Sequence, residues 1–427
     1  MVSLRSLSLV LLVGTASAAC RKQCVVPASG GTLSDSAAIQ EVLDRCNRDS
    51  LILFEEGSNY NVFEPIAALN LTNVILSVQG NLHLPQDISA VQKIVAGGNG
   101  HWFDFAGTDI QYIGNSDISH GWIYSYGQAW WSANAKAGGT GLPNRPHLMA
   151  FKATNGVMNY FKSSKPVAWN LAVKGSNISI ANAVVDSVSE DWSFPFNTDG
   201  VGIGATDVHV TDCVIYNGDD AFAISDGAKN VVVERSIIGY QTHGMSIGSL
   251  GSDAKKFYTV SNIRFDDITV AGGLYAARFK SWVGGQGLVK DVSWSNIRLY
   301  NVTFPIFITQ TYSDQGKASA NRPNNSSVQM RNFKWDNWAG SINSYNPGDG
   351  SCASNPCWYN VGLPNLKHNE AIIVECNEDD SCQGFAFDNM RIYPQDMTAP
   401  SVICMKATAE LNPNLGIDCR NGTYIPL

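Results

Sequence analysis

The chain has 427 residues, of which 44% are apolar and 15% charged, and it contains 39 glycines and 11 tryptophans. This composition is typical of a folded protein with a large core, and it excludes a disordered or collagen-like chain. The formal net charge of −8, with no cluster of Lys and Arg, argues against a nucleic-acid partner.

The first 18 residues have the pattern of a secretory signal peptide. Arg5 precedes an apolar run over residues 7–13, and residues 16–18 (Ala-Ser-Ala) supply a small-residue cleavage site. No other stretch reaches the roughly 20 consecutive apolar residues that a membrane span requires. We therefore expect a secreted, extracellular protein with no membrane partner, in which residues 19–427 form one catalytic domain.

A short helix is predicted over residues 36–45, with an N-cap offered by residues 34–36. Its apolar side chains fall on one face: Ile39, Val42, Leu43 and Cys46. Such a helix can cover the open apolar end of a stacked β structure, where a disulfide from Cys46 would hold it.

Ten cysteines indicate an oxidising compartment, and we expect disulfides between near neighbours in the sequence. The expected pairs are Cys352 with Cys357, Cys376 with Cys382, Cys404 with Cys419, and Cys46 with Cys20 or Cys24. Because no CxxC or HExxH spacing occurs, we expect neither a metal nor another cofactor. Six sequons suit a secreted glycoprotein: Asn70, Asn177, Asn301, Asn324, Asn325 and Asn421.

From residue 177 onwards the chain repeats itself. Six segments start with Asn or Asp, alternate two apolar positions with a polar one, and then reach a polar turn residue. Successive segments start 23 to 41 residues apart, which suits one coil of a solenoid with loops of varying length. The segments begin at Asn177, Asp207, Asn230, Asn262, Asp291 and Asn332.

The repeat predicts an all-β solenoid. A β-sandwich is the alternative, since it also consists of short strands. Recurrence of Asn or Asp at one position indicates stacked, equivalent turns, which a solenoid contains and a sandwich does not.

Four polar clusters follow these coils. Each alone is an ordinary turn composition, a structural histidine or an exposed charged face. Their positions change this interpretation, because Asp220 lies 12 residues after Val208 and His243 lies 12 after Val231, which predicts neighbours on adjacent coils. The clusters are Asn197-Thr198-Asp199-Gly200, Gly218-Asp219-Asp220, His243-Gly244 and Arg278-Phe279-Lys280.

Closely packed carboxylates predict acid–base chemistry. At least one of Asp199, Asp219 and Asp220 should have a raised pKa and keep its proton, as a general acid for a glycosidic oxygen must. The others, still ionised, could activate a water, and the two tasks together constitute glycoside hydrolysis. Arg278 and Lys280 would hold a substrate carboxylate.

At these residues the chain resembles the polygalacturonases of glycoside hydrolase family 28, over about residues 30–419. The resemblance implies a right-handed parallel β-helix that acts on pectic galacturonan by an inverting mechanism, as a monomer. It implies that Asp219 is the general acid and that Asp199 and Asp220 activate the water. His243 would support the acid, and the substrate would contact the remaining residues: Asn197, Arg278, Lys280 and Tyr312.

The chain departs from the family pattern in two places. Ala221 and Gly239 stand where endo-acting members have a bonded cysteine pair, so we expect Cys213 to be a buried free thiol. Phe279 replaces the usual Ile, and Trp282 follows, which favours a restricted pocket and an exo-acting relative. Endo-polygalacturonase, xylogalacturonan hydrolase and rhamnogalacturonan hydrolase activities stay open.

Two further sequence features favour cleavage at a chain end. Excursions over residues 346–366 and 131–147 are rich in Gly and Pro and could wall off one side of a cleft. A pectate-lyase-like enzyme and a non-catalytic carbohydrate-binding solenoid are the alternatives from other classes. The first would need calcium and a basic proton acceptor, and the second leaves three clustered aspartates unexplained.

Overall fold

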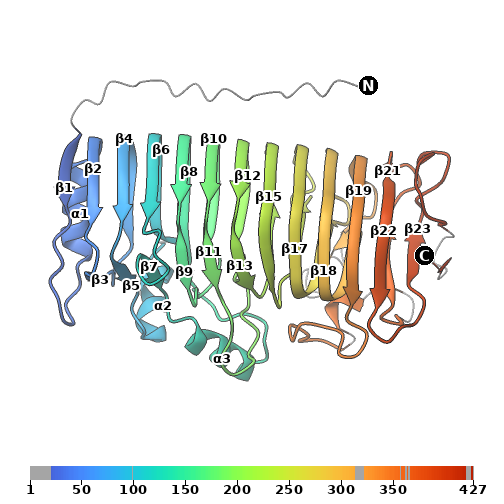
Figure 1. Ribbon diagram of the computed structural model, residues 1–427, viewed down its shortest axis with the longest axis horizontal. Coiled ribbons are helices and arrows are strands. Elements are labelled where there is room, and N and C mark those ends of the chain that lie inside the picture. The colour runs from blue at the N-terminus through green and yellow to red at the C-terminus, as the bar shows by residue number, and fades with distance from the viewer. Residues whose placement is uncertain are drawn as a thin grey trace, which may run out of the picture.

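The structure is a computed structural model in which the chain winds into a long stack of coils (Figure 1). It describes residues 21–98, 100–312, 322–355, 357–360, 363, 366–419 and 425–426. The predicted signal peptide and Cys20 lie outside the described residues.

Parallel strands form nearly all of the stack, and the only antiparallel pairing printed among the described strands joins the last two. The first coils contain β1 (Lys22–Val25), β2 (Arg48–Phe54), β3 (Asn59–Asn61), β4 (Ile66–Val78), β5 (Asn81–His83), β6 (His101–Gly114), β7 (Trp122–Tyr124), β8 (His147–Asn159), β9 (Lys162–Ser164), β10 (Leu171–Ala181) and β11 (Val184–Asp186). The later coils contain β12 (Val201–Thr211), β13 (Val214–Asn217), β14 (Asp220–Ile224), β15 (Lys229–Tyr240), β16 (Gly244–Leu250), β17 (Phe257–Trp282), β18 (Gln286–Tyr312), β19 (Val328–Ile342), β20 (Glu370–Glu375), β21 (Cys382–Gln383), β22 (Ala386–Pro394), β23 (Ser401–Met405) and β24 (Ile425–Pro426).

The predicted repeat is confirmed in register. Ile178 pairs with Val208, which pairs with Val231, and the series continues to Phe333 on β19. These side chains point into one continuous apolar core between the coils. The predicted parallel β-helix is therefore correct, and the alternative β-sandwich is wrong.

The Asn and Asp residues that start the repeats form a hydrogen-bonded turn ladder. Each has a positive φ, such as 54° at Asn230, a conformation that Asn and Asp tolerate better than most residues. The side chain of Asn230 donates to Asp207 Oδ1 at 2.7 Å and accepts from Asn262 Nδ2 at 2.8 Å. Asparagine therefore recurs because it adopts the turn and links the coils.

The described part of the chain contains three α-helices, α1 (Ser36–Arg45), α2 (Ile88–Ala96) and α3 (Gln128–Lys136), and a 3₁₀-helix, η2 (Trp358–Asn360). Helix α1 confirms the predicted capping helix and covers the N-terminal end of the stack in Figure 1. Cys46 at its end bonds to Cys24, which settles the choice left open by the sequence. Asp35 occupies the N-cap position, although its side chain makes no capping hydrogen bond.

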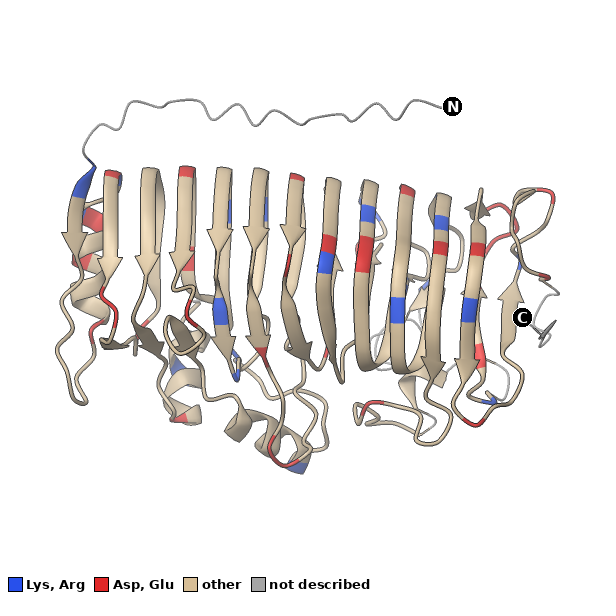
Figure 2. Ribbon diagram, in the orientation of Figure 1, with Lys and Arg blue, Asp and Glu red and all other residues tan. Residues whose placement is uncertain are grey.

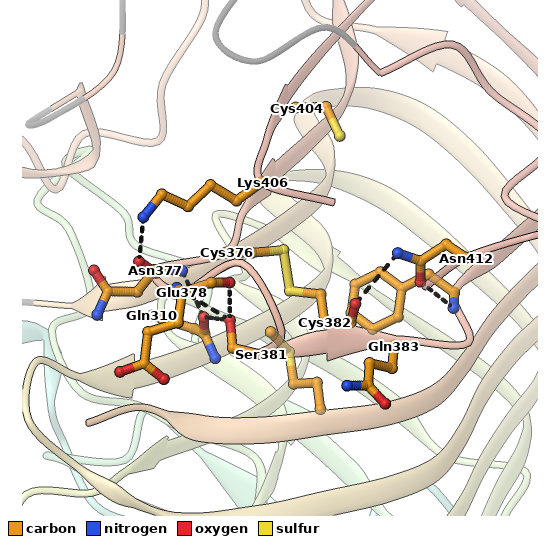
Figure 3. Close-up of a disulfide and its surroundings, with 12 residues drawn as sticks. Gln310, Cys376, Asn377, Glu378, Ser381, Cys382, Gln383, Cys404, Lys406 and Asn412 are labelled. Carbon is orange, nitrogen blue, oxygen red and sulfur yellow. Dashed lines mark hydrogen bonds between the residues drawn. A yellow bond between two sulfur atoms is a disulfide. The ribbon is translucent and has the colours of Figure 1, made fainter. Parts of the chain in front are cut away.

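The three other predicted disulfides are present, and Cys213 is a buried free cysteine as expected. The Cys376–Cys382 bond ties a turn at the C-terminal end of the stack (Figure 3). Within this turn Gln310 Oε1 accepts hydrogen bonds from Ser381 Oγ at 2.6 Å and from Asn377 N at 2.7 Å. The disulfide thereby supports the end of β18, which carries Tyr312.

Acidic and basic residues alternate along the outer strands (Figure 2). None of the described helices has the length and apolar character required to cross a membrane.

Candidate active site

A cleft of ≈ 390 Å³ lies beside β10, β12, β14, β16 and β17. Every residue predicted for the site lines it: Asn197, Asp199, Asp219, Asp220, His243, Arg278, Lys280 and Tyr312. A second hollow of ≈ 550 Å³ lies over the turn ladder and contains none of them, so its larger volume does not mark the site.

Strand pairing brings the predicted residues together. Arg278 pairs with Ser246, and Lys280 with Gly248, so both cations lie one coil beyond the strand that follows His243. Gly200 N donates to Asp220 O at 2.9 Å, which places Asp199 beside the paired aspartates.

The predicted alignment of His243 with Asp220 is wrong by one residue. Asp220 pairs with Gly244, and His243 N donates instead to Asp219 O at 2.8 Å. The cause is one extra residue between Tyr240 and Gly244 relative to the coil before. Simple counting from the strand start does not detect such an irregularity.

The register shifts back between Asp220 and Phe222, so Ala221 is an extra residue on β14. A bulge of this kind breaks the alternation of side chains and re-aims those beside it, and bulges often lie next to active sites. Here both Asp219 and Asp220, although consecutive, line the same cleft.

Asp220 is an ionised carboxylate held by three donors. Lys280 Nζ donates to its Oδ2 at 2.7 Å, Ser246 Oγ donates to its Oδ1 at 2.5 Å, and Arg278 Nη1 lies 3.8 Å from Oδ1. Burial opposes ionisation, but Lys280 and Arg278 outweigh it and lower the pKa of Asp220.

Asp219 has the opposite electrostatic character. Burial, followed by the charge of Asp220, raises its pKa to about 7. The backbone N–H of Asn197 donates to its Oδ2 at 2.5 Å, and His243 Nδ1 lies 3.4 Å from its Oδ1. Asp219 therefore holds a proton at pH values where Asp220 is ionised.

Asp199 shares this raised pKa. Burial is the main cause, and the charges of Asp219 and Asp220 add to it. Its Oδ1 is buried with no hydrogen-bond partner among the described residues. Because Asp199 and Asp219 repel each other, the pair titrates jointly, and protonation of one favours ionisation of the other.

Aromatic rings surround the guanidinium of Arg278. Its carbon lies 4.5 Å from the ring centre of Tyr275, 5.3 Å from that of Trp358 and 5.5 Å from that of Tyr312. Such contacts favour a cation and fix its position. Tyr312 is thus brought to the site as predicted, also 5.6 Å from Lys280 Nζ.

Asp349 was missed in the sequence. Its side chain is fully buried, and its Oδ2 accepts a hydrogen bond from His243 Nε2 at 2.7 Å. Ser351 donates to the other oxygen from both its N and its Oγ. Asp349 therefore orients His243 towards Asp219, although it lies in an irregular loop outside the repeat.

The excursion over residues 346–366 contributes to the wall of the cleft, as expected, through Ser351 and Trp358. The excursion over residues 131–147 does not line the cleft within the described structure. Its Arg145 instead donates to Phe196 O at 2.9 Å and to Asn197 Oδ1 at 2.7 Å, so this segment braces a cleft wall from behind.

The expected contribution of Phe279 to a restricted pocket is wrong. Strand alternation turns Phe279 away from Arg278 and Lys280 into the core, where it is fully buried and its ring centre lies 5.9 Å from that of Phe333. Trp282 does line the cleft, as expected.

In the described part of the chain, no group of three or more His, Cys, Asp or Glu side chains is arranged to hold a metal ion. The chemistry that the cleft supports is proton transfer between carboxylates of opposite protonation, beside cations that can bind an anion.

A parallel β stack with such a cleft defines a carbohydrate-active hydrolase, and comparison with protein-family models gives the same class. Residues 77–411 match the model for glycosyl hydrolases family 28. The chain belongs to this family of glycoside hydrolases.

Curated relatives match almost the whole chain. Probable exopolygalacturonase C from Aspergillus niger is 56% identical over 430 residues, covering 99% of this chain and 97% of the relative. The protein of the same name from Aspergillus terreus is also 56% identical, covering 95% and 93%. Exopolygalacturonase rpg15 from Rhizopus delemar is more distant, at 27% identity covering 75% and 79%.

Solved structures share the fold at low sequence identity. Endo-xylogalacturonan hydrolase from Aspergillus tubingensis superposes with a TM-score of 0.73 at 20% identity, covering 94% of this chain and 99% of that one. The family 28 exopolygalacturonase from Yersinia enterocolitica gives 0.62 at 12%, covering 90% and 73%.

Proposed function

We propose that this protein is an exo-acting hydrolase of pectic galacturonan that releases galacturonic acid from a chain end. The observation that carries the chemistry is the pairing of Asp219, whose pKa is raised to about 7, with the ionised Asp220 in one cleft. The substrate class follows from the adjacent cations and from the similarity to exopolygalacturonase C.

In the proposed reaction Asp219 donates its proton to the glycosidic oxygen as the bond to the anomeric carbon breaks. Asp199 and Asp220 orient a water on the opposite face of the sugar, and the water's oxygen forms the new bond to that carbon. The unpaired Oδ1 of Asp199 is available to accept the water's proton. Attack opposite to the leaving group inverts the anomeric configuration.

The anionic substrate accounts for the two cations. Lys280 Nζ neutralises Asp220, and Arg278, fixed among three rings, is placed to bind a substrate carboxylate together with it. Tyr312 and Asn197 complete the proposed contacts, and His243, held by Asp349, positions Asp219.

Exo action is supported by the loop that carries Ser351 and Trp358 into the cleft, since a wall on one side excludes an internal stretch of polymer. Product sizing over time on defined oligogalacturonides tests it. Galacturonic acid should appear from the first minutes while the viscosity of polygalacturonate falls slowly. A viscosity that collapses before much monomer forms would show internal cleavage instead.

We further propose that the protein is secreted as a monomer, with cleavage after Ala18 leaving residues 19–427 as one catalytic domain. The disulfides support an oxidising compartment, since such bonds are rare in the cytosol. N-terminal sequencing of protein recovered from culture medium, together with its mass in solution, tests this proposal.

A further inference from the structure

Lys174 is a cation at the cleft that the proposed reaction does not use. It is exposed on β10, two coils before the paired aspartates, and lines the cleft. No carboxylate pairs with it among the described residues, whereas Lys280 on the other side of those aspartates binds Asp220 at 2.7 Å. Lys174 therefore presents a positive charge that no protein group in the described structure neutralises.

The coil that follows leaves room for this ammonium group. Lys174 pairs with Gly204, and a Cβ added to Gly204 would overlap Lys174 Nζ and approach Ser225 Oγ within 2.6 Å. The lysine thus leans across Gly204 towards the coil that carries Asp219. Since coils lie about 4.8 Å apart, its charge lies roughly one coil from the paired aspartates.

Trp169 provides an apolar surface at the same end of the cleft. Its side chain is 44% exposed, and one of its faces stacks on His147 at a ring separation of 4.5 Å and an angle of 21°. Between Trp169 and Lys174 the cleft is lined by Ala172 and, on the next coil, by Gly202. These small residues leave space for a sugar ring beside an aromatic face, the usual arrangement at carbohydrate contacts.

From this arrangement we infer that Trp169 and Lys174 form a second uronic-acid subsite, on the N-terminal side of the catalytic aspartates. Trp169 contacts the sugar ring, and Lys174 binds its carboxylate. Arg278 and Lys280 then serve the sugar on the other side of the scissile bond, so each side has its own cation. This inference rests on the proposed function, because it assumes a galacturonan substrate.

Lys152 supplies a matched control. It is the neighbour of Lys174 on the preceding coil, but it is paired with Asp104 at 2.7 Å and does not line the cleft. Replacement of Lys174 by Met should lower kcat/KM on oligogalacturonides roughly 10- to 100-fold, mainly through KM, because a charge-assisted contact is lost. Lys152→Met should leave kcat/KM within twofold of the wild type.

Gly204→Ala gives an independent test, since the new methyl group displaces only the flexible end of Lys174 and a serine hydroxyl. It should lower kcat/KM in the same direction but less than Lys174→Met does. Methyl-esterified oligogalacturonides provide a further readout, because Lys174→Met should reduce the preference for free acid over ester. A purely structural role would lower both rates equally.

The outcomes separate the two proposals. If the wild type releases no galacturonic acid, the proposed function fails. If the wild type is active but Lys174→Met matches it within twofold, or keeps the same preference for acid over ester, the subsite is wrong and the proposed function stands.

Discussion

Asparagine and aspartate recur on two sides of this stack, in opposite surroundings. In the turn ladder they are exposed, adopt positive φ and donate to the next coil, as Asn230 does to Asp207. In the cleft, Asp199 and Asp219 are buried beside like charges, and their pKa values are raised. The first arrangement satisfies every polar group and stabilises the fold. The second leaves charges poorly solvated, which costs stability and produces acid–base reactivity.

The largest expected effect is on the acid. Asp219→Asn keeps the shape of the side chain but removes the proton, so kcat on oligogalacturonides should fall roughly 10²- to 10⁴-fold with the fold intact. An aryl galacturonide, whose leaving group needs little protonation, should recover much of the rate. Asp199→Asn should not be rescued in this way. Rescue of the Asp199 variant alone would exchange the two roles.

The pH dependence sharpens the same contrast. Asp219 must be protonated to act, so kcat/KM should decline about tenfold per pH unit above its pKa of about 7. The joint titration of Asp199 with Asp219 should produce a decline on the acidic side as well. A rate profile that stays flat from pH 6 to pH 9 would contradict the raised pKa.

The cleft carboxylates should also differ in their effect on stability. Asp220→Asn leaves Lys280 and Arg278 without their carboxylate and should cost roughly 3 kcal/mol in the free energy of unfolding. Asp199→Asn removes a carboxylate whose pKa is raised in the folded state. The native carboxylate favours folding least above that pKa, so the gain in melting temperature should grow as pH rises. Denaturant unfolding at pH 5 and pH 8 measures both, and changes of equal sign would contradict this contrast.

The smallest effect is expected in the turn ladder. Asn230→Ala loses two hydrogen bonds and places a Cβ at a positive φ, which should cost roughly 1–2 kcal/mol. Asn230→Gly loses the same hydrogen bonds without the backbone strain, so it should cost less. Both variants should keep wild-type kcat, because Asn230 lies outside the cleft. An equal cost for Ala and Gly would show that the turn conformation contributes nothing.

Much of the fold could be predicted because the ladder imposes a local rule on each coil. Asn or Asp starts a strand, apolar residues alternate after it, and the short cysteine separations leave few pairings. The cleft follows no such rule, so counting from the strand start misplaced His243 by one residue.

The residues missed at the site depend on packing between distant segments. Asp349 reaches His243 across 106 residues of sequence from an irregular loop. Lys174 resembles Lys152 in sequence, and only the pairing of Lys152 with Asp104 distinguishes them. Phe279 was placed in the pocket although the alternation of its strand points it into the core.

The stereochemistry of the first product tests the central claim most directly. If Asp219 protonates the leaving oxygen while Asp199 and Asp220 hold water on the opposite face, an α-linked galacturonide must yield the β anomer first. Inverting sites separate acid and base carboxyls by about 6.5–9.5 Å to admit that water. Proton NMR during the first turnovers, before mutarotation, should show β-galacturonic acid. The α anomer as first product would contradict the assignment of the three aspartates.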